Sequence, residues 1–506
     1  MTPQISIVAL SLLIGGLSPA ATTSQMAKTT STKPTEGDPS DLAVTAFIDG
    51  RHDEAVRLAE PLAKKGNSKA LLLMGLAYES GNGIEASLKL ALENYRKASK
   101  AGNLEATYRL AQLLVSTGEE ANQKEAQSLL ETLAKNDTGN AARILGEGIL
   151  QGWFGGEADF DKTRSWWERS AEKGDVAAIL GLARLLDGEF GFPEKRDPAA
   201  ALKQYVRAAE LGNAPAMTTA GSRYLNGEER IRDEKEGRKW LAKALENKQL
   251  DAYLVLGDYA ESVTKSDKSA WAEYKLGANG GNGRCMLKVA AFLLEGRGGQ
   301  QKDPDEALVW FKKAAKSGLI IGHVHAASIL LNGEDVNTVE GYTHLVAAAE
   351  SGLVDVQNEL GLLYLAGRLG IRDATAAAGW FRRSASGNFA PGAFNLATLH
   401  EQGVGVPQDF DQAGRLYTLA ANAGHANSTI ALARIYAEGR GTKQNLPKAW
   451  ALYSLAIERG VEDAKGFLTQ VADHLDDDQK KEASKILREM KAEKKDDSPS
   501  GGESGK

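Results

Sequence analysis

The chain has 506 residues, more than the roughly 250–300 residues that one hydrophobic core usually supports, so it forms either several domains or an array of repeats. Its composition is 42% hydrophobic and 25% charged with 54 glycines, which excludes a wholly disordered or a collagen-like chain. The net charge of -6 argues against nucleic acid as the main partner, and the one cysteine, Cys285, excludes an intramolecular disulfide and offers no pattern for a zinc site.

Residues 1–20 have the pattern of a signal peptide. The apolar run from Ile5 to Leu17 is too short to span a bilayer, and small residues follow it. No Lys or Arg precedes the run, which leaves a lipid-associated N-terminus or poor export as alternatives. We expect a mature protein without a membrane span, in the periplasm or outside the cell. Residues 21–40 are rich in Thr, Ser and Pro and predict a flexible linker.

From residue 41 to residue 460 the sequence repeats itself. A glycine closes an Ala-rich helical stretch every 34 to 38 residues, with Asn247 in its place once. These glycines are Gly66, Gly102, Gly139, Gly174, Gly212, Gly281, Gly318, Gly352, Gly387, Gly424 and Gly460. Periods of this length are typical of helical solenoids.

A Gly or Ala recurs at one position of the first helix in each repeat, which we call the small-residue position. Its members are Gly75, Ala111, Gly146, Ala183, Gly221, Gly257, Ala290, Ala327, Gly361, Ala397 and Ala433. An apolar residue precedes each of them. We interpret this position as the point where two helices pack closely, because a small side chain lets helix backbones approach.

The second helix of each repeat carries an aromatic or aliphatic pair followed by an Ala-Ala-like pair. Asp303-Pro304, Asp197-Pro198 and Asp409 predict where three of these helices begin, since Asp caps a helix and Pro fits its first turn. After the repeats, residues 461–490 have apolar residues at helical spacing and predict C-terminal capping helices, with Asp476 starting the last one. Residues 491–506 predict a disordered tail.

Together these motifs resemble the Sel1-like repeat, a relative of the tetratricopeptide repeat. The best matches are KDPDEALVWFKKAAKSG at 302–318 and FNLATLHEQGVGVPQDFDQAGRLYTLAANAG at 394–424, so 67–460 is interpreted as the Sel1-like array. Residues 41–66 have a short loop and resemble the tetratricopeptide form. The resemblance implies an all-α solenoid, or superhelix, of about twelve stacked helix-loop-helix repeats.

The glycine loops and the Ser-x-x-Lys patterns are the candidate ligand-binding and catalytic motifs of the sequence. Loops such as Gly403-Val-Gly405 have neither the strand nor the Lys-Ser/Thr pair of a phosphate cradle, so we expect left-handed turns there. Ser262 and Ser170 each precede a lysine by three residues, but the chain has no Lys-Thr-Gly. Some cysteine-rich Sel1-like proteins are associated with β-lactam binding, and a chain with one cysteine departs from them.

The seven histidines do not predict a metal site. His323 and His325 are two residues apart on a predicted helix and point to different faces, whereas shared ligation favours a spacing of three or four. Cys285 is expected to pack as a small apolar residue. We expect no metal, no cofactor and no catalytic residue.

The residue directly after each small-residue position, which we call the face position, is the candidate for binding. In proteins with similar repeats this position points into the concave groove, and here it is mixed and mostly polar. Its candidate partner-binding members are Gln112, Glu147, Arg184, Ser222, Asp258, Ser328, Thr398 and Arg434. A core position would be uniformly apolar, so we expect access to solvent.

The sequence therefore favours a non-enzymatic scaffold that binds a protein or peptide on the concave face. The alternative is that the concave face is only exposed to solvent and binds no partner. Recognition of a cell-wall or exopolysaccharide glycan is a second binding hypothesis, and a β-lactam-binding serine hydrolase is the enzyme alternative.

Overall fold

The computed structural model describes residues 38–135, 140–332, 338–368 and 372–496, and this part of the chain forms 26 α-helices and no β-strand. The predicted all-α solenoid is confirmed. The contacts divide the chain into two compact units, Met1–Tyr259 and Ala260–Lys506, with the boundary inside helix α15 (Asp251–Ser262). The predicted signal peptide and most of the predicted linker lie outside the described residues.

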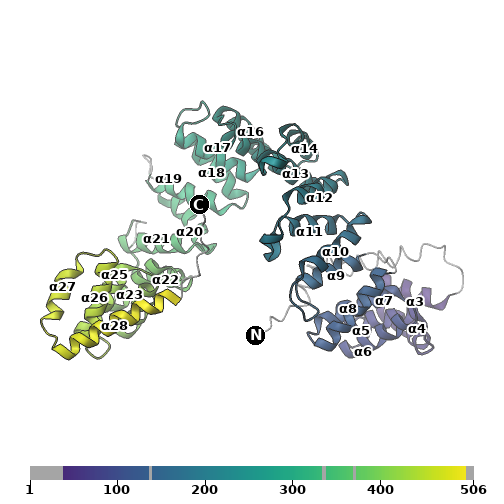
Figure 1. The fold of residues 1–506 in the computed structure, drawn as a ribbon, viewed down its shortest axis with the longest axis horizontal. Coiled ribbons are helices and arrows are strands. Elements are labelled where there is room, and N and C mark those ends of the chain that lie inside the picture. The colour runs from purple at the N-terminus through teal and green to yellow at the C-terminus, as the bar shows by residue number, and fades with distance from the viewer. Residues whose placement is uncertain (1–37, 136–139, 333–337, 369–371, 497–506) are drawn as a thin grey trace. The chain divides into compact units, whose positions relative to one another are not determined.

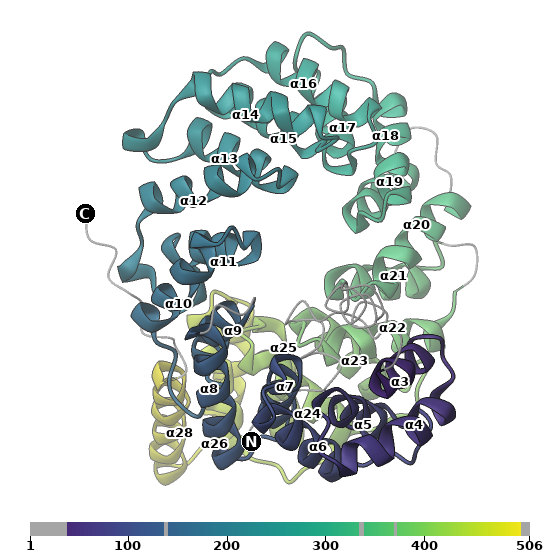
Figure 2. The same cartoon turned by 90° about the vertical axis from the view of Figure 1, so that its right-hand side faces the viewer.

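Unit 1 contains six helical hairpins that follow one another in chain order (Figures 1 and 2). They are α3 (Pro39–Ile48) with α4 (His52–Lys64), α5 (Ser68–Ser80) with α6 (Leu88–Lys100), α7 (Leu104–Ser116) with α8 (Glu120–Lys135), α9 (Ala141–Leu150) with α10 (Phe160–Glu172), α11 (Val176–Leu186) with α12 (Pro198–Glu210), and α13 (Ala214–Asn226) with α14 (Glu234–Glu246). Three short 3-10 helices, η1 (Glu189–Gly191), η2 (Pro193–Lys195) and η3 (Glu229–Ile231), lie in the loops.

Unit 2 begins with the end of α15 and continues the same architecture. Its helices are α16 (Asp267–Asn279), α17 (Gly283–Glu295), α18 (Pro304–Lys316), α19 (Ile320–Asn332), α20 (Thr338–Glu350), α21 (Val354–Ala366), α22 (Ala374–Ser386), α23 (Ala390–Gln402), α24 (Phe410–Asn422), α25 (Ala426–Glu438), α26 (Leu446–Glu458), α27 (Ala464–Ala472) and α28 (Asp477–Asp496). With α15 and α16 counted as one, the described residues contain twelve hairpins, as the sequence predicts.

One backbone hydrogen bond closes eight of these hairpins. The N–H of the residue that caps the second helix donates to a carbonyl in the last turn of the first helix, three residues after the small-residue position. The donor–acceptor pairs are Ser87–Tyr78, Asp197–Leu186, Asp233–Tyr224, Ser266–Ala260, Asp303–Leu293, Asp373–Tyr364, Asp409–His400 and Asn445–Tyr436. The side chains of the capping residues accept hydrogen bonds from backbone N–H groups in the first turn of the second helix. The predicted caps Asp197, Asp303 and Asp409 are thus confirmed.

The repeat-closing glycines have a left-handed backbone conformation in nine repeats. The first of them, Gly66, has φ 83, and the last, Gly460, has φ 90. Glycine suits this conformation because it has no Cβ. Two repeats differ. Gly387 has φ -85, and the next residue, Asn388, has the left-handed conformation instead. In the repeat that has Asn247 in place of the glycine, the next residue, Lys248, has the left-handed conformation. Gly139 lies outside the described residues.

The ends of the array differ slightly from the predicted boundaries. Helix α3 begins at Pro39, inside the predicted linker, and α28 continues to Asp496, six residues into the predicted tail. Asp476 accepts from the backbone N–H of Gln479 at 2.8 Å and so caps α28, as predicted. Helices α27 and α28 both pack on α26, and Met490 reaches the apolar core of that end. Of the helices in the described part of the chain, none is long and apolar enough to cross a membrane.

Candidate functional site

The small-residue position and the face position beside it differ consistently in burial. All eleven Gly or Ala residues at the small-residue position are buried. None of the eleven residues at the face position is buried: Arg184, Ser328, Leu362 and Arg434 are exposed, and the others are half-buried. The contrast follows from helix geometry, since adjacent residues point about 100° apart around the axis. The predicted solvent access is therefore present at all eleven face positions.

The buried small residues are needed because a large side chain of the second helix lies against them. A Cβ added to Gly361 would lie 2.5 Å from the Phe381 ring, and one added to Gly146 would lie 2.5 Å from the Trp167 ring. Phe381 is fully buried. This contact fixes which side of the first helix faces the second helix, and so leaves the face position outside it.

In unit 1, the predicted binding residues lie on successive first helices. Gln112 lies on α7, Glu147 on α9, Arg184 on α11, Ser222 on α13 and Asp258 on α15. Burial raises the pKa of the Glu147 carboxyl, and the nearby charges of Arg143 and Arg184 oppose that rise. Arg184 pairs with Glu189 at 2.7 Å and lies 4.8 Å over the Phe190 ring. Glu147 and Arg184 thus act on each other from neighbouring first helices, α9 and α11.

In unit 2, Ser328 lies on α19, Thr398 on α23 and Arg434 on α25. Thr398 and Arg434 converge on one polar cluster. The Thr398 hydroxyl lies 3.1 Å from the Tyr417 hydroxyl, and an Arg434 guanidinium N–H donates to Glu401 at 2.7 Å. Ser328 is exposed and lies apart from this cluster on a different hairpin.

Glu401 is the centre of that cluster and is not among the residues predicted from the sequence. Its side chain is 8% exposed, and it accepts a hydrogen bond from the Tyr417 hydroxyl at 2.8 Å. Burial, followed by the bond to Glu401, raises the pKa of Tyr417 well above its ordinary value. Arg434 thus links α25 to the preceding hairpin through a buried carboxylate, so it has a structural role as well as an exposed surface.

The same arrangement recurs at three other hairpins. Each has an acidic residue four positions after the small-residue position, in or just after the last turn of the first helix, beside a tyrosine of the second helix. The pairs are Glu79 with Tyr95, Asp187 with Tyr205, and Glu261 with Tyr274. A cation of the next first helix joins two of them, Arg223 at Asp187 and Lys288 at Glu261. Aligning the repeats on the small-residue position would have found all four acids.

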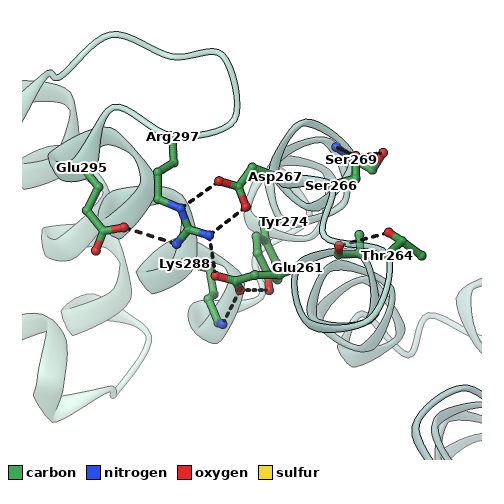
Figure 3. A network of polar contacts seen from close by, with 10 residues as sticks. Glu261, Thr264, Ser266, Asp267, Ser269, Tyr274, Lys288, Glu295 and Arg297 are labelled. Atoms are coloured by element: carbon green, nitrogen blue, oxygen red, sulfur yellow. Dashed lines mark hydrogen bonds and ion pairs between the residues drawn. The ribbon is translucent and has the colours of Figure 1, made fainter.

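Arg297 makes the Glu261 cluster the densest of the four (Figure 3). Its guanidinium donates twice to Asp267, at 2.9 and 2.8 Å, and contacts Glu261 at 2.9 Å and Glu295 at 3.2 Å. Hydrogen bonds to Asp267 raise the pKa of Arg297 further above its ordinary value. Burial raises the pKa of Glu261, but bonds from Lys288 and Tyr274 outweigh it and the net shift is downward. This cluster binds three consecutive helices together.

The two serines of the Ser-x-x-Lys patterns lie in different surroundings. Ser170 is buried and its hydroxyl donates to Asp175 at 2.9 Å, beside the start of the next helix. Ser262 lies exposed at the end of α15, and Lys265 follows it in a left-handed conformation. The glycines of the loops, including Gly403 and Gly405, have positive φ, so the predicted left-handed turns are confirmed.

Cys285 is buried on α17, and His323, His325 and His344 make ring contacts. His325 stacks on Phe311 at 4.7 Å, whereas the His323 ring meets His344, so the predicted divergence of His323 and His325 is confirmed. Within the described ranges, no group of three or more His, Cys, Asp or Glu side chains is placed to hold a metal ion.

Comparison with known families gives repeated matches along the chain. The family described as Sel1 repeat matches residues 68–103, 104–137, 139–175, 176–213, 214–248, 283–319, 354–389, 390–425 and 426–461. Residues 249–282 and 320–353 lie between matches, yet they too form helical hairpins.

Relatives and solved structures are similar at low identity. The chain is 25% identical over 274 residues to the chitin synthase regulator SKT5 of Saccharomyces cerevisiae, covering 53% of this chain and 35% of the relative. It is 25% identical over 212 residues to cytochrome c oxidase assembly factor 7 of Xenopus tropicalis, covering 41% and 78%. The chain thus spans about a third to a half of the length of the chitin synthase regulators it matches. A Sel1 repeat protein from Oxalobacter formigenes aligns at 25% identity over 61% of this chain and 90% of that one, with a TM-score of 0.45.

Proposed function

This chain belongs to the Sel1 repeat family, and we propose that it is a non-enzymatic scaffold that binds a protein or peptide partner on the face positions of its first helices. The observation that carries the proposal is the burial contrast: eleven small residues are buried, while none of the eleven residues beside them is. Within each unit, accessible and varied side chains on consecutive first helices form a suitable surface for a partner. The similarity to a chitin synthase regulator and to a cytochrome c oxidase assembly factor supports a role exercised on other proteins.

The test compares two exposed leucines on different helices of the array. Leu362 is a face position on α21 and is 45% exposed, and Leu419 lies on the second helix α24 and is 42% exposed. We expect Leu362→Asp to lower recovery of a crosslinked partner from an envelope extract by about tenfold, which corresponds to a loss of about 1.4 kcal/mol of binding free energy. Leu419→Asp is the matched control and should leave recovery unchanged.

Charge reversal at Arg434 would be a poorer test of the same surface. Arg434 pairs with the buried Glu401, so Arg434→Glu would place two carboxylates together and disturb folding as well as binding. Equal recovery with Leu362→Asp and Leu419→Asp would contradict the proposed face. Recovery of glycan with no stoichiometric protein would favour the glycan-binding alternative.

We also propose that the protein is exported, on the basis of the apolar run from Ile5 to Leu17 and the small residues after it. The test is fractionation of cells that make the full chain, with N-terminal sequencing of the mature form. Retention of the intact N-terminus in the cytoplasmic fraction would contradict export.

A further inference from the structure

Two histidine side chains meet across the hairpin formed by α19 and α20. The Nδ1 atoms of His323 and His344 lie 2.9 Å apart, and their ring centroids are 4.9 Å apart with the ring planes at 53°. Both side chains are half-buried, so they are held by their helices and still reachable from solvent. The hairpin is one of the two that lie between the family matches.

A contact between two imidazole nitrogens at this distance holds a single proton. One Nδ1 carries the hydrogen and donates it, and the other accepts with its lone pair, so the contact requires that at least the accepting ring be neutral. Burial and the charge of His323 lower the pKa of His344, while Glu340 opposes this shift and Lys312 adds to it. Neutral imidazole is the form that binds metal ions.

The nitrogen separation also matches the spacing of two neighbouring ligands around one ion. With metal–nitrogen bonds of about 2.0 Å, ligands at right angles are about 2.8 Å apart, whereas tetrahedral ligands are about 3.3 Å apart. The observed 2.9 Å therefore fits the square or tetragonal coordination of Cu(II) and Ni(II) better than the tetrahedral coordination of zinc. Affinity for nitrogen ligands is highest for Cu(II) among these divalent ions.

We infer that His323 and His344 form a two-histidine site for a divalent transition metal, with Cu(II) as the preferred ion. The ion takes the place of the shared proton and binds both Nδ1 atoms, and water fills its other positions. The hydrogen that lies between the two Nδ1 atoms moves to Nε2 of its own ring, so each ring binds the ion through Nδ1 and keeps one N–H, and the neutral pair releases no proton. The site is independent of the proposed partner surface.

The experiment is a calorimetric titration of Cu(II) into the full chain near neutral pH, repeated with Ni(II) and Zn(II). We expect one site that binds Cu(II) most tightly. His323→Ala and His344→Ala should each weaken this site by at least about tenfold, because a single imidazole remains. His325→Ala is the matched control: this histidine is two residues from His323 and stacks on Phe311, so its loss should leave the affinity unchanged.

Two further variants separate loss of the site from loss of the fold. His323→Gln and His344→Gln keep a side chain that can form hydrogen bonds but remove the imidazole ligand. They should retain the helical circular dichroism of the wild type and lose the nitrogen hyperfine pattern of two equivalent imidazoles in the Cu(II) electron paramagnetic resonance spectrum. Equal Cu(II) affinity in the wild type and the His323 variants, or an equal loss in His325→Ala, would overturn the inference.

Discussion

Two hairpin loops of unit 2 differ in length and share the same polar contacts. The hairpin of α23 and α24 lies within a family match and has the loop Gly403-Val-Gly405, whereas that of α15 and α16 lies between matches and has a shorter loop without glycine. Both close on the same backbone bond, from Asp409 to His400 at 2.9 Å and from Ser266 to Ala260 at 2.8 Å. The bonded residues are nine apart in one chain segment and six apart in the other.

The polar contacts of the two hairpins also correspond. Tyr417 donates to Glu401 at 2.8 Å, and Tyr274 donates to Glu261 at 2.8 Å. A cation of the following first helix joins each pair. The hairpin is thus defined by the contact between its helices and by one capping bond, and the loop can shorten without changing either.

The loop glycines serve a different contact, with the hairpin before. A Cβ added to Gly405 would lie 2.3 Å from the backbone carbonyl of Ala374, at the start of α22. Gly441, Gly298 and Gly83 approach the preceding second helix in the same way. The long loop therefore packs successive hairpins together. Substitutions in the loop and substitutions between the two helices of a hairpin should lower the free energy of unfolding by different amounts.

The largest effect is expected at this loop contact. Gly405→Ala should lower the free energy of unfolding by about 3 kcal/mol or more, since it combines a left-handed backbone with overlap against a backbone that cannot move aside. Gly424→Ala is the control: Gly424 also has a positive φ, of 92, but a Cβ there meets nothing within 4 Å, so only about 1 kcal/mol of backbone strain is expected. Urea unfolding measures both, and equal losses would show that the loop contact contributes nothing.

A somewhat smaller effect is expected inside a hairpin. Gly361→Ala should cost about 2 kcal/mol, because the new methyl group overlaps the fully buried Phe381 ring. Gly379→Ala on the partner helix α22 should instead stabilise by up to about 1 kcal/mol, since nothing lies within 4 Å and alanine favours helix. Amide hydrogen exchange should localise the loss to α21 and α22. A stabilising Gly361→Ala would mean that the small-residue position is not a packing constraint.

The sequence predicts this repeated packing well because the signal recurs. Eleven Gly or Ala residues at one position leave little doubt about which side of the helix is buried, and the caps Asp197, Asp303 and Asp409 act within a few residues of themselves. The polar clusters were missed for the opposite reason. An acid follows the small-residue position by four in four repeats only, and its tyrosine lies 13 to 18 residues away on another helix. The contact of His323 with His344 depends on the register between two helices, which a single sequence does not give.

The third effect is on stability at acidic pH. It tests whether the Glu261 cluster stabilises the hairpin with the shorter loop. The pKa of Glu261 in the folded chain lies below its ordinary 4.5, since bonds from Lys288 and Tyr274 outweigh burial. Its stabilisation is therefore complete above pH 4.5 and is lost as the pH falls through the lowered value. Glu261→Gln should cost about 1–2 kcal/mol near neutral pH and should flatten the acid limb of the stability profile.

Glu295→Gln is the control for that variant, because Glu295 contacts the same Arg297 but is 56% exposed. It should change stability by less than about 1 kcal/mol, as surface ion pairs do. Urea unfolding across an acidic pH series measures both variants. An unchanged acid limb in Glu261→Gln would show that the cluster does not stabilise the hairpin.

The smallest effect is a gain at the shorter loop. Lys265 has φ 55, a left-handed conformation that disfavours any residue with a Cβ, so the loop keeps a strain that glycine relieves in the longer loops. Lys265→Gly should stabilise by about 0.5–1 kcal/mol, which is the relieved strain less the extra freedom that glycine has in the unfolded chain. Lys265→Ala removes the same long side chain but keeps the Cβ, so it should give no gain. If both variants behave alike in urea unfolding, the backbone is not strained, and the shorter loop is as well suited to its hairpin as the glycine loop is.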